Sequence, residues 1–218
     1  MTITFYYGSG SPFSWYVWFV LEYKQLPYQL KLLSLQNGEL KAPDYLAIHH
    51  RGKVPALTNH EQTFLESVAI VEYLEDRYPE SPVFPSQPEA RGRVRQLIQE
   101  AHGYLYPPLR RLMERTLMRP LEKPSSDDKV VIETAITELR RELDYFEHAI
   151  TGDFLCGEQV TAGDFALYPL LALVNRIREK QPQYNLLLVP GVKTGALMAR
   201  MEQLPSFETT YPPHWREA

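Results

Sequence analysis

The sequence predicts an α/β domain followed by an all-helical domain, and three observations support this. Strand-like and helical patterns alternate in the first third of the chain. A proline-rich segment follows, with four prolines between Pro79 and Pro88. Beyond it, long amphipathic segments follow one another without a convincing strand pattern. We therefore expect domains over 1–79 and 89–218, joined by a semi-rigid linker over 80–88.

The first domain is expected to contain four strands and three helices. Strands over Thr2–Tyr7 and Tyr28–Leu33, with a helix over Pro12–Tyr23 between them, make a parallel βαβ unit. A short helix is expected over Glu39–Ile48. Strands over Ala56–Thr58 and Thr63–Leu65 are joined by a turn over Asn59–Gln62, and a helix follows over Val68–Arg77. This order, βαβαββα, is that of a thioredoxin-like domain.

The second domain is expected to be a helical bundle. Its amphipathic segments cover Glu89–Met118, Asp127–Ile150, Ala162–Glu179 and Gly191–Gln203. Thr161 and Asp164 stand three residues apart before the third of these, which is the spacing of a capping box. We therefore expect a structural role for Asp164.

Composition and charge exclude several classes of protein. There are 23 lysines and arginines against 27 acidic residues, a formal net charge of −4, so nucleic acid and anionic membrane are not expected as partners. No apolar run reaches the roughly 20 residues needed to cross a bilayer, and the first residues lack a signal-peptide pattern, so we expect a cytoplasmic protein. The single cysteine, Cys156, excludes an internal disulfide and is expected to be a small buried core residue.

The segment from Gly52 to Ser67 has the features of a binding site for a small acidic peptide. Val54-Pro55 stands at the entrance to a strand, and a cis bond there would turn the backbone of Val54 outward to pair with a peptide ligand. Ser67 is expected to cap the following helix, whose free N–H groups favour a carboxylate.

Five features together make the chain resemble the cytosolic glutathione transferase superfamily over essentially its whole length. They are Ser11-Pro12-Phe13-Ser14, Gly52-Lys53-Val54-Pro55, Glu66-Ser67, the proline-rich linker and Thr161–Asp164. The resemblance implies a first domain that holds glutathione as co-substrate, a helical domain that supplies most of an electrophile pocket, and a homodimer. No metal is implied. The adjacent histidines His49 and His50 lack a carboxylate or cysteine at a ligand spacing.

The resemblance also assigns the glutathione-binding residues. Val54 would exchange backbone hydrogen bonds with the cysteinyl part of glutathione, while Pro55 holds the cis geometry. Glu66 and Ser67 would bind the ammonium and the carboxylate of the γ-glutamyl end. Lys53 would face the glycine carboxylate, with Lys41 as a second candidate. The alternative for Lys53 is a solvated surface lysine.

A transferase must stabilise the thiolate of glutathione, because the thiolate, and not the thiol, is the nucleophile. A hydroxyl that donates a hydrogen bond to the sulfur would do this. Ser11 begins the first predicted helix, where its hydroxyl and the helix N-terminus could both stabilise a thiolate. Serine followed by proline is also a good helix start in its own right. Tyr7 ends the first strand, where tyrosine-type members of the family keep a catalytic phenol. The sequence leaves the choice open, with Ser9 and Ser14 as further candidates.

The leading hypothesis is a transferase that conjugates the glutathione thiolate to a small apolar electrophile. Phe13, His102 and Tyr106 are the residues that we expect to line the electrophile pocket; each could equally belong to an aromatic core. A glutathione-dependent reductase, peroxidase or isomerase would have the same glutathione-binding residues. A non-catalytic ligand-binding or interaction protein with this fold is the alternative from another class.

Overall fold

The computed structural model describes residues 3–34, 37–60, 62–118, 125–182 and 191–216. The chain forms two compact units, one of Met1–Phe84 with Gln203–Ala218 and one of Pro85–Glu202. The sequence places residues 203–216 in the helical domain, whereas in the structure they pack with the first unit. The domain boundaries predicted at 79 and 89 stay a prediction.

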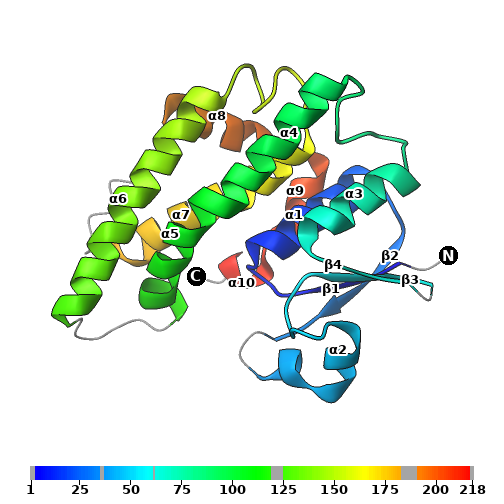
Figure 1. The fold of residues 1–218 in the computed structure, drawn as a ribbon, viewed down its shortest axis with the longest axis horizontal. Coiled ribbons are helices and arrows are strands. Elements are labelled where there is room, and N and C mark those ends of the chain that lie inside the picture. Colours follow the sequence, from blue (N-terminus) through cyan, green and yellow to red (C-terminus); the bar gives the residue numbers. More distant parts are fainter. Residues whose placement is uncertain (1–2, 35–36, 61, 119–124, 183–190, 217–218) are drawn as a thin grey trace. The chain divides into compact units, whose positions relative to one another are not determined.

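The first unit is built on a four-stranded mixed sheet (Figure 1). Its elements are β1 (Ile3–Tyr7), α1 (Pro12–Tyr23), β2 (Tyr28–Leu32), the 3₁₀ turn η1 (Glu39–Lys41), α2 (Pro43–Ile48), β3 (Ala56–Asn59), β4 (Gln62–Leu65) and α3 (Ser67–Arg77). The strand order is β2-β1-β3-β4, with β1 parallel to β2 and the other neighbours antiparallel. The predicted thioredoxin-like order is confirmed, and only Thr2 of the first predicted strand lies outside the described residues.

Alternation along β1 sends neighbouring aromatic side chains to opposite faces of the sheet. The Tyr7 ring lies 4.8 Å from that of Trp18 in α1, centroid to centroid, whereas the Tyr6 ring lies 5.9 Å from that of Tyr45 in α2. Figure 1 shows α1 and α3 on one side of the sheet and α2 on the other. Tyr6 and Tyr7 therefore point to opposite faces of the sheet.

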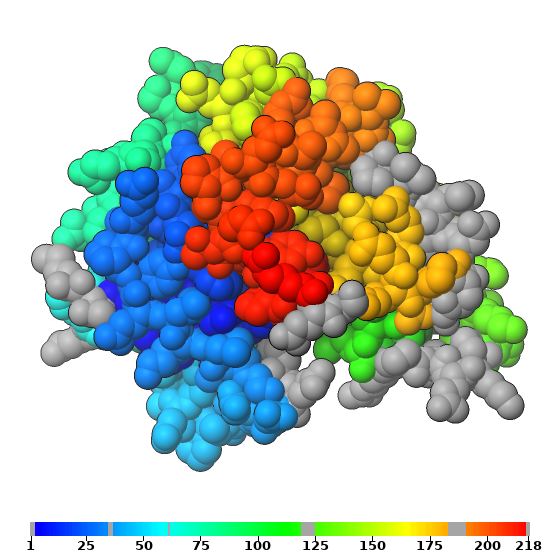
Figure 2. All heavy atoms as spheres, turned by 180° about the vertical axis from the view of Figure 1, so that it is seen from behind, coloured from blue at the N-terminus to red at the C-terminus, as the bar shows by residue number. Residues whose placement is uncertain are grey.

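The end of the chain packs on α1 through two short helices that the sequence did not reveal. These are α9 (Pro205–Thr210) and α10 (Pro213–Arg216). The indole N–H of Trp15 donates to Thr210 Oγ1 at 3.0 Å, and its ring meets that of Trp215 edge to face at 5.5 Å. In Figure 2 the red C-terminal residues accordingly lie against blue N-terminal ones.

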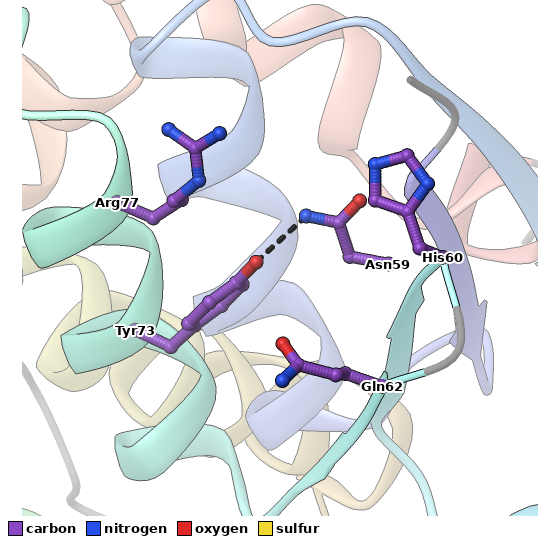
Figure 3. Close-up of a pocket in the computed structure, with 5 residues that line it drawn as sticks. All are labelled: Asn59, His60, Gln62, Tyr73 and Arg77. Atoms are coloured by element: carbon purple, nitrogen blue, oxygen red, sulfur yellow. Dashed lines mark hydrogen bonds between the residues drawn. The ribbon is translucent and has the colours of Figure 1, made fainter.

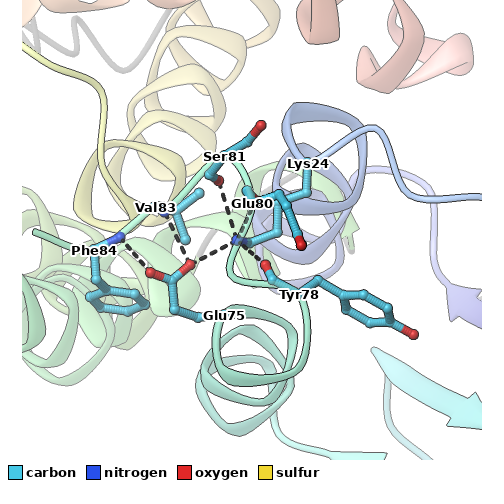
Figure 4. Close-up of polar contacts among 7 residues, drawn as sticks. All are labelled: Lys24, Glu75, Tyr78, Glu80, Ser81, Val83 and Phe84. Atoms are coloured by element: carbon cyan, nitrogen blue, oxygen red, sulfur yellow. Dashed lines mark hydrogen bonds and ion pairs between the residues drawn. The ribbon is translucent and has the colours of Figure 1, made fainter. Parts of the chain in front are cut away.

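A buried ion pair joins the C-terminal ends of α1 and α3 (Figure 4). Lys24 Nζ lies 2.8 Å from Glu75 Oε2, and their side chains are 0% and 5% exposed. The ammonium also donates to the carbonyls of Tyr78, Glu80 and Ser81, at 2.9, 3.3 and 3.2 Å.

The Glu75 carboxylate accepts in turn from the backbone N–H groups of Val83 and Phe84, at 3.1 and 3.2 Å. The first residues of the predicted linker are thus fixed by charge-assisted hydrogen bonds within the first unit.

The second unit is helical in the part that the structure describes, apart from an isolated bridge between Phe154 and Gly157. Its elements are α4 (Pro88–Glu100), the π-helical η2 (Ala101–Leu105), α5 (Tyr106–Met113), the π-helical η3 (Glu114–Met118), α6 (Ser126–Ala149), α7 (Ala162–Lys180) and α8 (Val192–Met201). The amphipathic segment predicted over Glu89–Met118 is therefore interrupted by one π turn and ends in a second. Pro107 and Pro108, which lack an N–H, lie in the first turn of α5, directly after η2. None of the described helices is long and apolar enough to span a bilayer.

The predicted capping box is present at the start of α7. The buried Asp164 carboxylate accepts from the N–H and the hydroxyl of Thr161, at 2.7 and 2.8 Å, and from the N–H of Leu155 at 2.7 Å. Asp164 thus orders both the helix start and the loop before it.

Cys156 lies in this loop and is half-buried, so it is less buried than predicted. Burial is the main cause that raises the pKa of its thiol to about 11.

Removing the cation of the buried pair should strongly destabilise the protein. In Lys24→Met the Glu75 carboxylate stays buried without its counterion, and we expect a loss of about 3–5 kcal/mol in the free energy of unfolding. Urea titration followed by circular dichroism measures this loss. Arg110→Met is the matched control, because both side chains of the Arg110–Glu114 pair are exposed and the pair should contribute less than about 1 kcal/mol. A loss below about 1 kcal/mol for Lys24→Met would contradict the importance of the pair.

Asp164 should make stability fall as pH rises. Burial raises the pKa of its carboxyl to about 6, against about 3.9 in an unfolded chain, despite the hydrogen bonds that it accepts. The unfolded state therefore loses this proton first, and ionisation between about pH 4 and pH 6 favours unfolding. The variant Asp164→Asn does not titrate. We expect the stability of the wild type relative to this variant to decrease across that range, and an increase would show that the prediction is wrong.

Candidate functional site

The loop between β1 and α1 forms the centre of the candidate site. Ser11 is the N-cap of α1 and its Oγ accepts from the N–H of Ser14 at 3.3 Å, while Pro12 occupies the first helical position. The N–H of Ser11 donates to the carbonyl of Gly8 at 3.0 Å, which closes the loop. A half-buried hydroxyl is thereby held at the positive end of a helix of 12 residues.

A small pocket brings the two candidate donors together. It is lined by Tyr7, the loop 8–11, Trp15, Trp18, Thr210 and Pro212. Thr210 and Pro212 were missed by sequence reasoning, because they reach the pocket from the far end of the chain. The available signals were Pro205 and Pro213, each at the first position of a short helix.

Tyr7 is buried in this pocket against Trp18 and keeps its proton. Its side chain is 7% exposed, and burial raises the pKa of the phenol above its ordinary value. A protonated phenol is a hydrogen-bond donor. Trp18 also donates from its indole N–H to the Tyr28 hydroxyl at 2.6 Å.

The other two serine candidates are less accessible to a ligand than Ser11. Ser9 Oγ lies 2.8 Å from Nδ1 of His214 in α10. Ser14 is buried, and its Oγ accepts from the N–H of Gly8 at 3.3 Å. The Ser9 hydroxyl is therefore paired and the Ser14 hydroxyl is shielded by burial, whereas Ser11 is half-buried and lines the pocket, which leaves Ser11 and Tyr7 as the stronger candidates.

The segment before β3 has the expected backbone geometry. The Val54-Pro55 peptide bond is cis, as the sequence predicts. Gly52 has a φ of +57°, and a Cβ at this position would lie 2.3 Å from the carbonyl oxygen of Leu40, so only glycine fits. Lys53 is exposed, and its carbonyl accepts from the Tyr45 hydroxyl at 2.5 Å. Lys41 Nζ donates to the carbonyl of Arg51 at 3.3 Å.

The start of α3 differs from the prediction by one residue. Ser67 was expected to be the cap, but it is the first helical residue, and the N-cap is Glu66. Glu66 has a φ of +67°, which is unusual for a residue with a side chain, and it makes no side-chain cap bond. Its carboxylate is exposed and lies 3.9 Å from Nη1 of Arg51. The helix start is thus left open, with Ser67 buried beside it.

The residues predicted to line an electrophile pocket fall in both units. Phe13 lies in α1 of the first unit, whereas His102 lies in η2 and Tyr106 in α5 of the second. Burial lowers the pKa of His102 to about 4, so this imidazole is neutral at neutral pH, and burial raises the pKa of Tyr106. That the three residues form one pocket stays a prediction.

The adjacent histidines serve the backbone. His49 is buried, and its Nδ1 accepts from the N–H of Arg51 at 3.3 Å. Burial is the main cause that lowers the pKa of His49. Among the residues with described positions, no three His, Cys, Asp or Glu side chains are grouped so as to hold a metal ion.

Comparisons with known proteins identify the family of this chain. The model of the glutathione S-transferase N-terminal domain matches residues 5–82, and that of the C-terminal domain matches residues 109–205. The chain is 30% identical over 194 residues to a zeta-class glutathione S-transferase of Euphorbia esula, covering 88% of this chain and 82% of that protein. It is 28% identical over 202 residues to a probable maleylacetoacetate isomerase of Caenorhabditis elegans, covering 91% and 88%.

Among solved structures, the chain is similar to a glutathione S-transferase from the Antarctic clam Laternula elliptica. The TM-score is 0.81 and the identity 29%, over 100% of this chain and 95% of the other. The fold, the sequence and both domain models thus agree. The chain belongs to the glutathione S-transferase family, in which glutathione is the co-substrate.

Proposed function

We propose that this protein is a glutathione transferase that conjugates the glutathione thiolate to a small apolar electrophile. The observation that carries the proposal is the pocket at the start of α1, where Ser11 and Tyr7 lie together. Both can donate a hydrogen bond, and the helix N-terminus adds positive potential. A pocket with these features favours a thiolate over a thiol.

Ser11 is proposed as the donor to the sulfur. Its Oγ accepts from the N–H of Ser14, which leaves its own O–H proton available to a ligand and polarises it. Tyr7 is buried against Trp18 and is proposed to contribute packing and a second donor. A free thiol has a pKa of about 8.5, so a decrease of one to two pKa units makes a large fraction ionised at neutral pH.

The rest of glutathione is proposed to lie along the segment from Lys53 to Ser67. Val54 would pair through its backbone with the cysteinyl part, next to the cis bond to Pro55. The open start of α3, with Ser67, suits the γ-glutamyl carboxylate, and the exposed Glu66 suits its ammonium. Among the lysines, Lys53 is favoured for the glycine carboxylate because Lys41 already donates to a carbonyl.

The second substrate is proposed to contact Phe13, His102 and Tyr106. A neutral imidazole and two aromatic rings suit a small apolar electrophile with one polar group. We further propose a homodimer in the cytoplasm, as the resemblance to the family implies.

Isomerisation is a second candidate function. It is favoured by the similarity to the probable maleylacetoacetate isomerase of C. elegans. A thiolate that adds to a conjugated double bond and is expelled after rotation would isomerise the substrate and regenerate glutathione. The same Ser11 site would serve both reactions, so product analysis must distinguish them.

Replacing the proposed donors should raise the pKa of bound glutathione. In Ser11→Ala, and to a smaller extent in Tyr7→Phe, the thiolate loses a hydrogen bond, and we expect an increase of about one pKa unit, equivalent to about 1.4 kcal/mol. Absorbance of the thiolate as a function of pH measures this increase. Ser9→Ala is the control, since its hydroxyl faces His214. If neither donor variant changes the pKa, the assignment of the thiolate site is wrong.

Conjugation should consume one glutathione for each electrophile that reacts. With a panel of uncharged electrophiles we expect a thioether product, detected by mass spectrometry, and a turnover that falls at least about tenfold in Ser11→Ala. A substrate that changes configuration while glutathione stays constant would favour the isomerase. Oxidised glutathione as the only product would argue against transfer, and the absence of turnover over the whole panel would favour a binding protein.

A further inference from the structure

The first unit contains another hollow, formed by residues that the proposed function does not use (Figure 3). It lies between the second half of α3 and the β3–β4 hairpin and has a volume of about 490 Å³. It is lined by residues with polar side chains, which are Asn59, His60, Gln62, Tyr73 and Arg77. No carboxylate is among the described residues of this lining.

Asn59 presents an unsatisfied acceptor to this hollow. Its side chain is 5% exposed, and its Nδ2 donates to the hydroxyls of Tyr73 and Tyr78, at 2.6 and 3.2 Å. Its Oδ1 is buried and has no hydrogen-bond partner among the described residues. Figure 3 shows this oxygen facing the space between Arg77 and His60. A buried acceptor without a donor is unfavourable, so the arrangement suits a ligand that brings an O–H or N–H group.

Arg77 supplies positive charge at the same place. Its guanidinium stacks on the ring of Tyr78, 5.2 Å from the centroid, and within the described parts of the chain it forms no ion pair. Tyr78 also accepts from Asn59, so one tyrosine positions both groups. The donors of Arg77 are therefore available for a planar or tetrahedral oxyanion.

Two side chains of the hairpin complete the lining. His60 has a φ of +56°, and Gln62 begins β4 directly after the turn. Both side chains are exposed, and neither makes a hydrogen bond to another described residue. Their ring N–H and amide N–H groups add donors for negative oxygens.

We propose that this hollow binds a small oxyanion that keeps an O–H group, such as hydrogen phosphate or a 2-hydroxycarboxylate. Arg77, His60 and Gln62 would donate to the charged oxygens, and Asn59 Oδ1 would accept the O–H. An oxyanion without an O–H group should bind more weakly, because one of its negative oxygens would then face the partly negative Oδ1 of Asn59. The inference is independent of the proposed transferase activity.

The test compares matched pairs of anions on the full chain at neutral pH and constant ionic strength. Phosphate is compared with sulfate, and glycolate with acetate, by NMR titration of the side-chain amides of Asn59 and Gln62. We expect the member with an O–H to bind about fivefold tighter or more. Tighter binding of phosphate than of sulfate identifies a phosphate site, and tighter binding of glycolate than of acetate identifies a hydroxy-acid site.

Variants separate a specific site from general attraction of anions. Arg77→Gln should weaken binding about tenfold, whereas Lys31→Gln, which removes an exposed cation on β2, should not change it. Equal binding within both pairs, no saturation up to about 20 mM, or equal losses in the two variants would overturn the proposal. Asn59 itself is left unchanged because its hydrogen bonds to Tyr73 and Tyr78 support the fold.

Discussion

The buried pair of Lys24 and Glu75 is the interaction on which the geometry of the first unit depends. It joins the C-terminal ends of α1 and α3, while the opposite ends of these helices carry Ser11 and Ser67. Because helices are stiff, fixing their ends also fixes their starts, where the proposed glutathione site lies. The negative ends of both helix dipoles favour an ammonium at this place, and three carbonyls complete its coordination. One lysine thus links the two helices whose starts carry the proposed site.

Polar groups in this protein fall into two kinds, and the difference separates structural from functional residues. Asp164 and Ser14 are buried and have partners for their hydrogen bonds, so they order a helix start and a loop. The start of α3 is different, because its N-cap makes no side-chain bond and has a φ of +67°. Such an outlier persists only where the surrounding structure holds it, and it commonly marks a binding site.

Sequence reasoning succeeded where the signal was local. The bounds of α1 follow from Ser11-Pro12 at its start, and the cis bond follows from a proline at a strand entrance. It failed where the signal was not local. The contact between Trp15 and Thr210 joins residues 195 positions apart, and the left-handed backbone of Glu66 follows from no preference of glutamate. The lysine–glutamate pair is of the same kind, since nothing near either residue indicates the other.

The charges of α5 bear on the choice between the two proposed reactions. His102 is neutral at neutral pH, and the nearby Arg110 pairs with Glu114 at 2.7 Å. Arg111 is likewise paired, with Glu138 of α6. A substrate with carboxylates would have to displace one of these acidic partners to find a cation on α5, whereas an uncharged electrophile needs no such exchange. If the second substrate binds at α5 as proposed, this charge arrangement suits a neutral electrophile better than a substrate with carboxylates.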